Sequence, residues 1–389
     1  MCIRYATLEC ATNAMKSYPL FVLVFASAAP AISAAPTMFD VFHRQQVDSA
    51  NVSYFCFRIP ALVRRADDAL IAFAEGRHVN CDDAGDVRIV RRISYDEGET
   101  WSDIAQVKVE PGHTIGNPCP IVDLVTGHIH LLYSRDNKEV FVTRSTDGGE
   151  SWGASTNLTA SLKLELDPES IFVATGPPGG VQLASGRLVG GFYYNGLNGT
   201  RSAAIFSDDH GATWRRGAEV FVSQTPLPNA SSVVYMGGEC QVTSYAPAGP
   251  QGLVMLMRVR GDFPTNAVDH NHATAISRDG GETWTVASLI HATSSYCEGS
   301  IATVGKSVLI SAPSTTNGGR ANLTVWAARP VGESLDAQYS LTVYPGASAY
   351  SSMLAGKRGG TVLNLFERDN DPYVPKNLTL ATFDVPALR

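Results

Sequence analysis

A short motif recurs four times and constrains the fold more than any other feature. The pattern Ser-x-Asp-x-Gly-x-Thr/Ser-Trp begins at Ser94, Ser145, Ser207 and Ser277, at intervals of 51, 62 and 70 residues. Its Asp can accept hydrogen bonds from backbone N–H groups of its own turn, and its Gly supplies a position with positive φ. The hydroxyls satisfy further backbone groups, and the Trp ring packs between sheets. Each motif therefore predicts a tight structural turn between two strands rather than a ligand contact.

The stretches around these motif turns repeat one unit of short strands. In the first unit the predicted strands cover residues 57–63, 70–75 and 87–93, and a motif turn follows the third strand. Five more units follow, and the last two have no motif turn. Six such units predict an all-β fold, a six-bladed β-propeller of four-stranded antiparallel blades. The later predicted strands are 120–124, 128–133 and 140–144; 181–184, 187–193 and 203–206; 240–244, 253–258 and 273–276; 300–303, 307–312 and 323–328; 349–354, 361–366 and 378–383.

The N-terminus has the order of a targeting signal. Lys16 precedes an apolar run over residues 19–32, and small residues follow at 33–35. A charged, then an apolar, then a small-residue segment is typical of a signal peptide. We therefore expect residues 1–35 to be a leader and residues 36–389 to form a single propeller domain in the secretory pathway.

The sequons and cysteines are consistent with a protein of the secretory pathway. With a signal peptide, several of the six Asn-x-Ser/Thr sequons are expected to carry glycans at the surface. Five cysteines follow the leader, so at least one stays free or pairs with another chain, and their spacing suggests no metal site. The sequons are at Asn51, Asn157, Asn198, Asn229, Asn322 and Asn377, and the cysteines are Cys56, Cys81, Cys119, Cys240 and Cys297.

Charge and composition limit the partners. The 389-residue chain has a net charge of −7, so its composition does not indicate the positive charge that is typical of proteins that bind nucleic acid. Its 44% of hydrophobic residues can bury a sizeable core, and its 17% of charged residues is low enough to argue against disorder. We expect a globular protein that does not bind nucleic acid.

The propeller topology predicts which residues meet. In an antiparallel blade the start of strand one, the end of strand two and the loop to strand three share one face, opposite the motif turns. Arg58, Arg258 and Arg320 occupy such positions in the first, fourth and fifth units. A single arginine of this kind is more often solvated or structurally paired. Three guanidiniums on one face, however, predict a site for a carboxylate or phosphate.

Four further polar residues pass the same topological test. Tyr350 begins the inner strand of the sixth unit, and Glu239 begins that of the fourth. Asp82 and Asp83 occupy the loop between the second and third strands of the first unit. Together with the arginines, these residues supply an anion clamp, a base, a nucleophile and an acid.

At this point a family resemblance can be stated. The Phe-Arg-Ile-Pro segment at 57–60, followed by the four motif turns, resembles the exo-sialidases (neuraminidases) of the non-viral, six-bladed type. The likeness extends from about Phe39 to the C-terminus. The leader, the sequons and the segment Ala-Phe-Ala-Glu-Gly-Arg at 72–77 are similar to the lysosomal animal type.

The resemblance implies a role for each candidate. Arg58, Arg258 and Arg320 match the triad that holds the sialic acid carboxylate. Tyr350 matches the nucleophile, and Glu239 matches the carboxylate that activates it.

The remaining roles follow from the same resemblance. Asp83 matches the acid/base, and Asp82 stays open as the alternative at a slip of one residue. Glu367 looks like the carboxylate that orients the first arginine of the triad. Arg77 and Asn117 resemble residues that line the glycan pocket.

The implied chemistry explains the unusual nucleophile. Sialic acid carries a carboxylate on its anomeric carbon, which would repel an Asp or Glu nucleophile, whereas a neutral phenol avoids that repulsion. Asp83 would be neutral in the first step, which suits an acidic working pH, and the outcome would be hydrolysis with retention of configuration. No metal or organic cofactor is expected.

Several alternatives stay open. The chain could transfer sialic acid to another sugar as a trans-sialidase, or bind sialosides as a lectin of weak catalytic power. A propeller scaffold for protein partners would leave the arginines unexplained. The resemblance implies sialylated glycoproteins, gangliosides and oligosaccharides as substrates, a protective protein partner if the chain is of the lysosomal type, and a lysosomal or secreted location.

Overall fold

A computed structural model of the chain describes residues 35–169, 171–197, 199–221, 236–260, 271–290, 292–317, 319–332, 334–368 and 374–385. The predicted leader lies outside these described residues, apart from Ala35. Within them, no helix is both long and apolar enough to cross a membrane.

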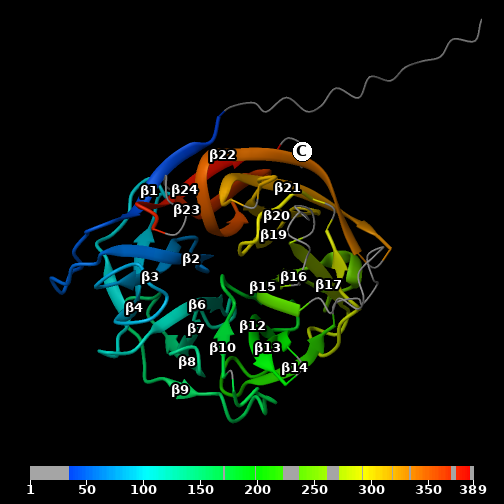
Figure 1. Cartoon of the computed structure of the whole chain (residues 1–389), viewed down its shortest axis with the longest axis horizontal. Coiled ribbons are helices and arrows are strands. Elements are labelled where there is room, and N and C mark those ends of the chain that lie inside the picture. The colour runs from blue at the N-terminus through cyan, green and yellow to red at the C-terminus, as the bar shows by residue number, and fades with distance from the viewer. Residues whose placement is uncertain are drawn as a thin grey trace, which may run out of the picture. The chain divides into compact units, whose positions relative to one another are not determined.

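The described residues form antiparallel sheets that follow one another around a common centre, as a β-propeller does (Figure 1). Three of the sheets are four-stranded meanders in chain order, in line with the predicted units. The first holds β2 (Cys56–Arg64), β3 (Leu70–Arg77), β4 (Val87–Ser94) and β5 (Ala105–Lys108); the second holds β6 (Ile115–Val122), β7 (Ile129–Arg135), β8 (Glu139–Ser145) and β9 (Thr156–Asn157). The last of the three corresponds to the fourth predicted unit. It holds β15 (Met236–Ser244), β16 (Leu253–Arg260), β17 (His272–Ser277) and β18 (Ser288–Leu289), with the 3-10 turn η1 (Ala246–Ala248) after β15.

The predicted inner strand of the third unit, residues 181–184, is correct only at residues 181–182. Its sheet begins instead at β10 (Val173–Thr175), and β11 (Val181–Gln182) is only a two-residue strand that also pairs with β12. The intervening residues 176–180 read Gly-Pro-Pro-Gly-Gly, and Pro cannot donate to a strand ladder. The other strands of this sheet are β12 (Leu188–Gly196), β13 (Gly199–Ser207) and β14 (Arg215–Val220).

The prediction of six separate four-stranded sheets is also wrong, because the last two predicted units share one seven-stranded sheet. Strand β22 (Ser334–Ala355) runs for 22 residues, pairing first with β21 and then with β23. The link between the two units stays extended where a loop was expected. The other strands are β19 (Ser300–Val304), β20 (Ser307–Pro313), β21 (Ala321–Val331), β23 (Thr361–Arg368), β24 (Asn377–Asp384) and β1 (Thr37–His43).

The N-terminal strand completes this last sheet. Thr37 of β1 pairs with Thr382 of β24, and His43 pairs with Asn377. Hydrogen bonds between the first and last described strands tie the two ends of the sheet arrangement together, which restrains its opening.

The four motif turns are structural, as predicted. In the first, the Ser94 hydroxyl donates to Asp96 (2.8 Å), and the N–H groups of Gly98 and Thr100 donate to Ser94 and Asp96 (2.8 and 2.9 Å). Trp101 donates its indole N–H to the Gly98 carbonyl (3.0 Å). The Ser and Asp bonds recur in the other three turns. Gly98 has a φ of 93°, which favours glycine.

The cysteine prediction is confirmed in its general form. Cys56 and Cys81 form a disulfide, whereas Cys119, Cys240 and Cys297 are free and buried. Among the sequons, Asn51 and Asn157 are exposed, Asn322 and Asn377 are half-buried, and Asn198 and Asn229 lie outside the described residues.

A buried carboxylate joins two neighbouring sheets on the face of the motif turns. Asp123, between β6 and β7, has a fully buried side chain. It pairs with Gln182 of β11 (2.8 Å) and with His210 of the third motif turn (2.7 Å), and it accepts the N–H of Val125 (2.9 Å). Burial alone would raise the pKa of Asp123, but these hydrogen bonds outweigh it and lower that pKa.

We expect Asp123→Asn to lower the free energy of unfolding at pH 7 by about 2 kcal/mol, because it removes charge-assisted hydrogen bonds. A depressed folded-state pKa contributes stability that is present above the ordinary carboxyl pKa of about 4 and is lost as pH falls. Urea unfolding of both proteins at several pH values should show the difference shrinking below about pH 4. The exposed Asp103→Asn serves as a control, and a difference that did not change with pH would contradict this account.

Candidate active site

One cavity of about 270 Å³ gathers the residues predicted for the site. It lies where inner strands β2, β6, β15 and β22 begin or bend, together with the end of β3 and the loop from β20 to β21. Glu367, at the end of β23, contacts the cavity through Arg58. The predicted residues that line the cavity are Arg58, Arg77, Asp83, Asn117, Glu239, Arg258, Arg320 and Tyr350.

Irregularities in four inner strands direct one side chain each into the cavity. The register of each strand pair shifts at this point, with Asn117, Glu239 and Tyr350 inside the shifts and Arg58 at the edge of one. A β-bulge bends its strand and redirects a side chain, and bulges are frequent beside active sites. The backbone of four different strands is thus shaped to present polar groups to one cavity.

Arg58 is held by a buried carboxylate. Its side chain is nearly inaccessible, with the residue 4% exposed, and its Nε and Nη2 donate to the two oxygens of Glu367 at 3.0 and 3.1 Å. The same carboxylate accepts the N–H of Ile59 (3.0 Å), a residue with a φ of 53°. A buried guanidinium requires such a partner, and removing one member of a pair like this costs about 3–5 kcal/mol. Glu367 therefore neutralises the charge of Arg58 and holds the backbone at Ile59.

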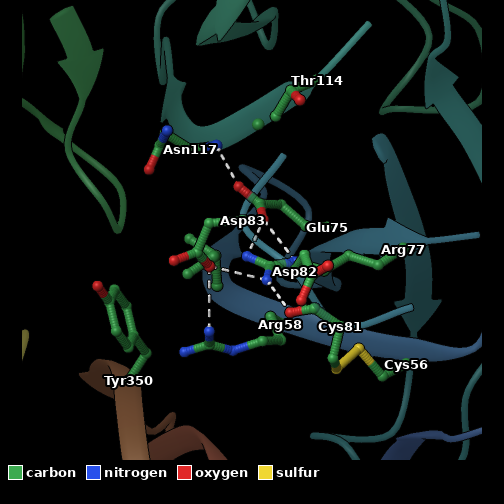
Figure 2. Close-up of polar contacts among 12 residues, drawn as sticks. Cys56, Arg58, Glu75, Arg77, Cys81, Asp82, Asp83, Thr114, Asn117 and Tyr350 are labelled. Carbon is green, nitrogen blue, oxygen red and sulfur yellow. Dashed lines mark hydrogen bonds and ion pairs between the residues drawn. A yellow bond between two sulfur atoms is a disulfide. The ribbon is translucent and has the colours of Figure 1, made fainter. Parts of the chain in front are cut away.

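Asp83 lies above Arg58 and beside Arg77 (Figure 2). Its Oδ1 accepts from Arg77 Nη1 at 2.8 Å and from Arg58 Nη1 at 3.3 Å, although 81% of its side chain is exposed. Desolvation by the surrounding protein would raise the pKa of Asp83, but the charges of Arg77 and Arg58 outweigh it and lower that pKa. Asp82 instead accepts from Asn80 (2.6 Å), and of the two neighbouring aspartates only Asp83 lines the cavity.

Tyr350 and Glu239 form a buried pair. The Tyr350 hydroxyl donates to Glu239 Oε1, and Arg258 Nη1 donates to both oxygens of the same carboxylate at 3.1 and 2.9 Å. Burial, together with the charge of Glu239, raises the pKa of Tyr350 well above its ordinary value. The phenol is therefore neutral at rest, with a proton acceptor already in contact.

The three arginines surround this phenol. The guanidinium carbons of Arg58 and Arg320 lie 5.4 and 5.9 Å from the centroid of the Tyr350 ring. Arg258 binds Glu239, which in turn accepts the Tyr350 hydroxyl. The guanidinium carbon of Arg258 lies 3.8 Å from the centroid of the Tyr296 ring. A ligand carboxylate that enters here would meet three fixed cations beside a neutral phenol.

Arg77 and Asn117 are tied to a carboxylate that the sequence reasoning missed. Buried Glu75 accepts from Arg77 Nη2 (2.7 Å) and from the N–H of Asn117 (2.8 Å). A Cβ at residue 116 would lie 2.3 Å from Glu75 Oε1, so any larger residue there would displace this carboxylate. The signal was available, since a charged residue inside the apolar strand 70–77 needs a buried partner.

Glu298 was also missed, although it lies only two residues before the inner strand β19. Its buried carboxyl accepts the N–H of Ser351 (2.8 Å), the residue that follows Tyr350. Burial raises the pKa of Glu298 well above its ordinary value, and the charges of Glu239 and Glu367 add to this effect. A neutral acid thus supports the strand that carries Tyr350.

Comparisons with known proteins show what this chain is similar to. A family model described as BNR repeat-like domain matches residues 68–363. A sialidase of Micromonospora viridifaciens is 32% identical over 195 residues, which cover 43% of this chain and 29% of that protein. Sialidase-2 of Mus musculus is 29% identical over 259 residues, covering 57% of this chain and 64% of that one. The chain thus spans less than two thirds of either relative. Among solved structures, the Hadza microbial sialidase Hz136 matches with a TM-score of 0.69 and 25% identity, over 86% of this chain and 67% of that one.

Proposed function

Because this chain belongs to the BNR repeat-like domain family and its cavity surrounds a buried tyrosine with three arginines, we propose that it is an exo-α-sialidase. The observation that carries the proposal is the contact of the Tyr350 hydroxyl with Glu239, next to cations able to bind a carboxylate. Few sugars carry a carboxylate on the reacting carbon, and sialic acid is the one for which glycosidases use a neutral phenol.

In the proposed first step, Glu239 takes the phenolic proton as the Tyr350 oxygen attacks the anomeric carbon. Asp83 donates its proton to the glycosidic oxygen, and the aglycone leaves. In the second step, Asp83 removes a proton from water, which attacks the same carbon. Tyr350 then leaves and regains its proton from Glu239. Two inversions give retention of configuration.

Substrate binding makes it easier for Asp83 to take up, from solvent, the proton that the first step needs. In the free protein the arginines keep this carboxyl ionised, because they lower its pKa. A substrate carboxylate that binds Arg58 would neutralise part of that charge and place a like charge nearby, and both effects raise the pKa of Asp83. The acid form is therefore favoured in the complex, at mildly acidic pH.

Asp83→Asn is expected to lower kcat/KM for α2,3-sialyllactose by about 100-fold or more, because an alkoxide leaving group needs a proton. For 4-nitrophenyl sialoside, whose phenolate leaves unaided, kcat/KM should fall by less than about tenfold. Steady-state kinetics on both substrates measure the contrast, with Asp82→Asn as the matched control. Equal losses on the two substrates would contradict an acid role for Asp83.

Three activities can be separated in one assay. The purified chain is incubated with α2,3-sialyllactose and a second galactoside acceptor, and free sialic acid and sialylated acceptor are quantified by chromatography. Free sialic acid as the main product supports hydrolysis. Sialylated acceptor as the main product would favour the trans-sialidase alternative, and binding without turnover would favour a lectin.

Sialylated glycoproteins, gangliosides and oligosaccharides are the proposed substrates, and a lysosomal or secreted location is proposed with them. The Cys56–Cys81 disulfide supports an oxidising compartment such as the secretory pathway. A protective protein partner belongs to the lysosomal alternative and would be sought by co-purification from an expressing cell.

We further propose that the seven-stranded sheet acts as two of six blades. Residues of β22 up to Ala347 pair with β21, and residues from Ser348 onward pair with β23. One hydrophobic cluster contains Leu309 and Val325 from the first half together with Val362 and Phe366 from the second. The N–H of Met353 in the second half also donates to Ser300 Oγ of β19 (2.8 Å), which is three strands away along the sheet, and this contact supports two halves that face one another as blades do.

A further inference from the structure

The Cys56–Cys81 disulfide lies beside the proposed acid (Figure 2). It joins the first residue of β2 to the loop between β3 and β4, with the two Cα atoms 5.9 Å apart. Cys56 stands two residues before Arg58, and Cys81 stands two residues before Asp83. One covalent bond thus links the strand that carries a carboxylate-binding arginine to the loop that carries the acid.

Cys81 is the buried anchor of that loop. It is 8% exposed, whereas every other residue from His78 to Gly85 is exposed. The loop is fastened at its base, where the N–H of His78 donates to the Asp86 carbonyl (3.1 Å) and that of Gly85 donates to Thr114 Oγ1 (2.9 Å). Between these points the disulfide supplies the covalent restraint.

The remaining contacts hold Asp83 less firmly. Its ion pairs with the buried Arg58 and Arg77 both use the single oxygen Oδ1 of a side chain that is 81% exposed, so water competes for this carboxylate. The Cys81 carbonyl accepts from Arg77 Nη1 (2.5 Å), so the loop backbone and the acid depend on the same guanidinium. Fixing Cys81 therefore also fixes the distance from Asp83 to Arg77.

We propose that the Cys56–Cys81 disulfide is a positioning element for Asp83, which keeps the acid over the site and makes proton donation dependent on the oxidised state of this pair. The inference rests on the proposed function. Both arginines keep other carboxylates when the loop is released, since Glu367 holds Arg58 and Glu75 holds Arg77. Loss of the disulfide therefore weakens acid catalysis and spares the binding of the substrate carboxylate.

The test compares the oxidised wild type, the wild type reduced with dithiothreitol, and the double variant Cys56→Ser/Cys81→Ser. Dithiothreitol becomes its cyclic disulfide as the protein pair becomes two thiols, and thiol alkylation with mass spectrometry confirms complete reduction. We expect kcat/KM for α2,3-sialyllactose to fall by about tenfold or more, and that for 4-nitrophenyl sialoside by less than about threefold. KM should change little for either substrate.

The double variant also serves as the control for the three free thiols. It should show the same substrate contrast, and dithiothreitol should not change it further. Equal losses on both substrates, with a lower melting temperature, would show a merely structural role and overturn the inference. Full activity of the completely reduced wild type would overturn it as well. An oxidised wild type that cleaved neither substrate would overturn the proposed function and this inference with it.

Discussion

Tyr350→Phe is expected to lower kcat by about 10³-fold or more, because the variant has no oxygen to attack the anomeric carbon. The change removes one hydroxyl from a buried ring. Arg258 continues to neutralise Glu239 through its bonds at 3.1 and 2.9 Å, so the site keeps its charge balance and the variant should fold. The measurement is the release of sialic acid under saturating α2,3-sialyllactose.

A matched control lies on the same strand. Tyr339 of β22 is 47% exposed and far along the strand from the cavity, so Tyr339→Phe should retain wild-type kcat. Circular dichroism and thermal unfolding establish that both variants are folded. A folded Tyr350→Phe protein that kept more than about one tenth of the wild-type kcat would contradict the nucleophile assignment.

Glu239→Gln is expected to lower kcat by about 10² to 10⁴-fold. An amide cannot take the phenolic proton, and burial keeps the pKa of Tyr350 well above its ordinary value, so the phenolate is inaccessible without a base. The variant also leaves Arg258 without its carboxylate, which should cost about 3–5 kcal/mol of stability. Steady-state kinetics and urea unfolding measure the two effects separately.

The chain offers a second tyrosine–glutamate pair as a control. Outside the cavity, the Tyr194 hydroxyl donates to Glu219, which also lies 3.5 Å from Arg201. Glu219→Gln alters a contact of the same chemistry without reaching the site, so kcat should stay near the wild-type value. If Glu219→Gln lost as much activity as Glu239→Gln, or if Glu239→Gln stayed active, the base assignment would fail.

Much of the fold could be predicted because its signals are local. The motif turns contain their own hydrogen-bond partners within eight residues, so the bonds of Ser94 and Asp96 follow from composition and spacing. Strand β22 was harder, since nothing local distinguishes an extended link from a loop. The inner strand of the third unit was predicted only in part, because the pairing of β10 with β12 depends on contacts across the sheet.

The candidate site followed from topology more than from any single residue. In the predicted topology, the starts of the first strands and the ends of the second strands lie on one face. This argument alone predicts that Arg58, Glu239 and Tyr350 lie close together. Glu75, which holds Arg77 and Asn117, and Glu298, which accepts the N–H that follows Tyr350, were missed because a buried carboxylate is recognised by what it contacts. Likewise, the disulfide could not be deduced from five cysteines, because spacing does not determine connectivity.

The most direct test of the proposed mechanism is to trap the covalent intermediate. The protein is incubated with a 2,3-difluorinated sialic acid, whose fluorine at C3 slows release of the glycosyl enzyme, and is then digested and mapped by mass spectrometry. The account predicts one sialosyl adduct, on the peptide that contains Tyr350, and none in Tyr350→Phe. An active enzyme with its adduct on another residue, or with inverted product and no adduct, would contradict it.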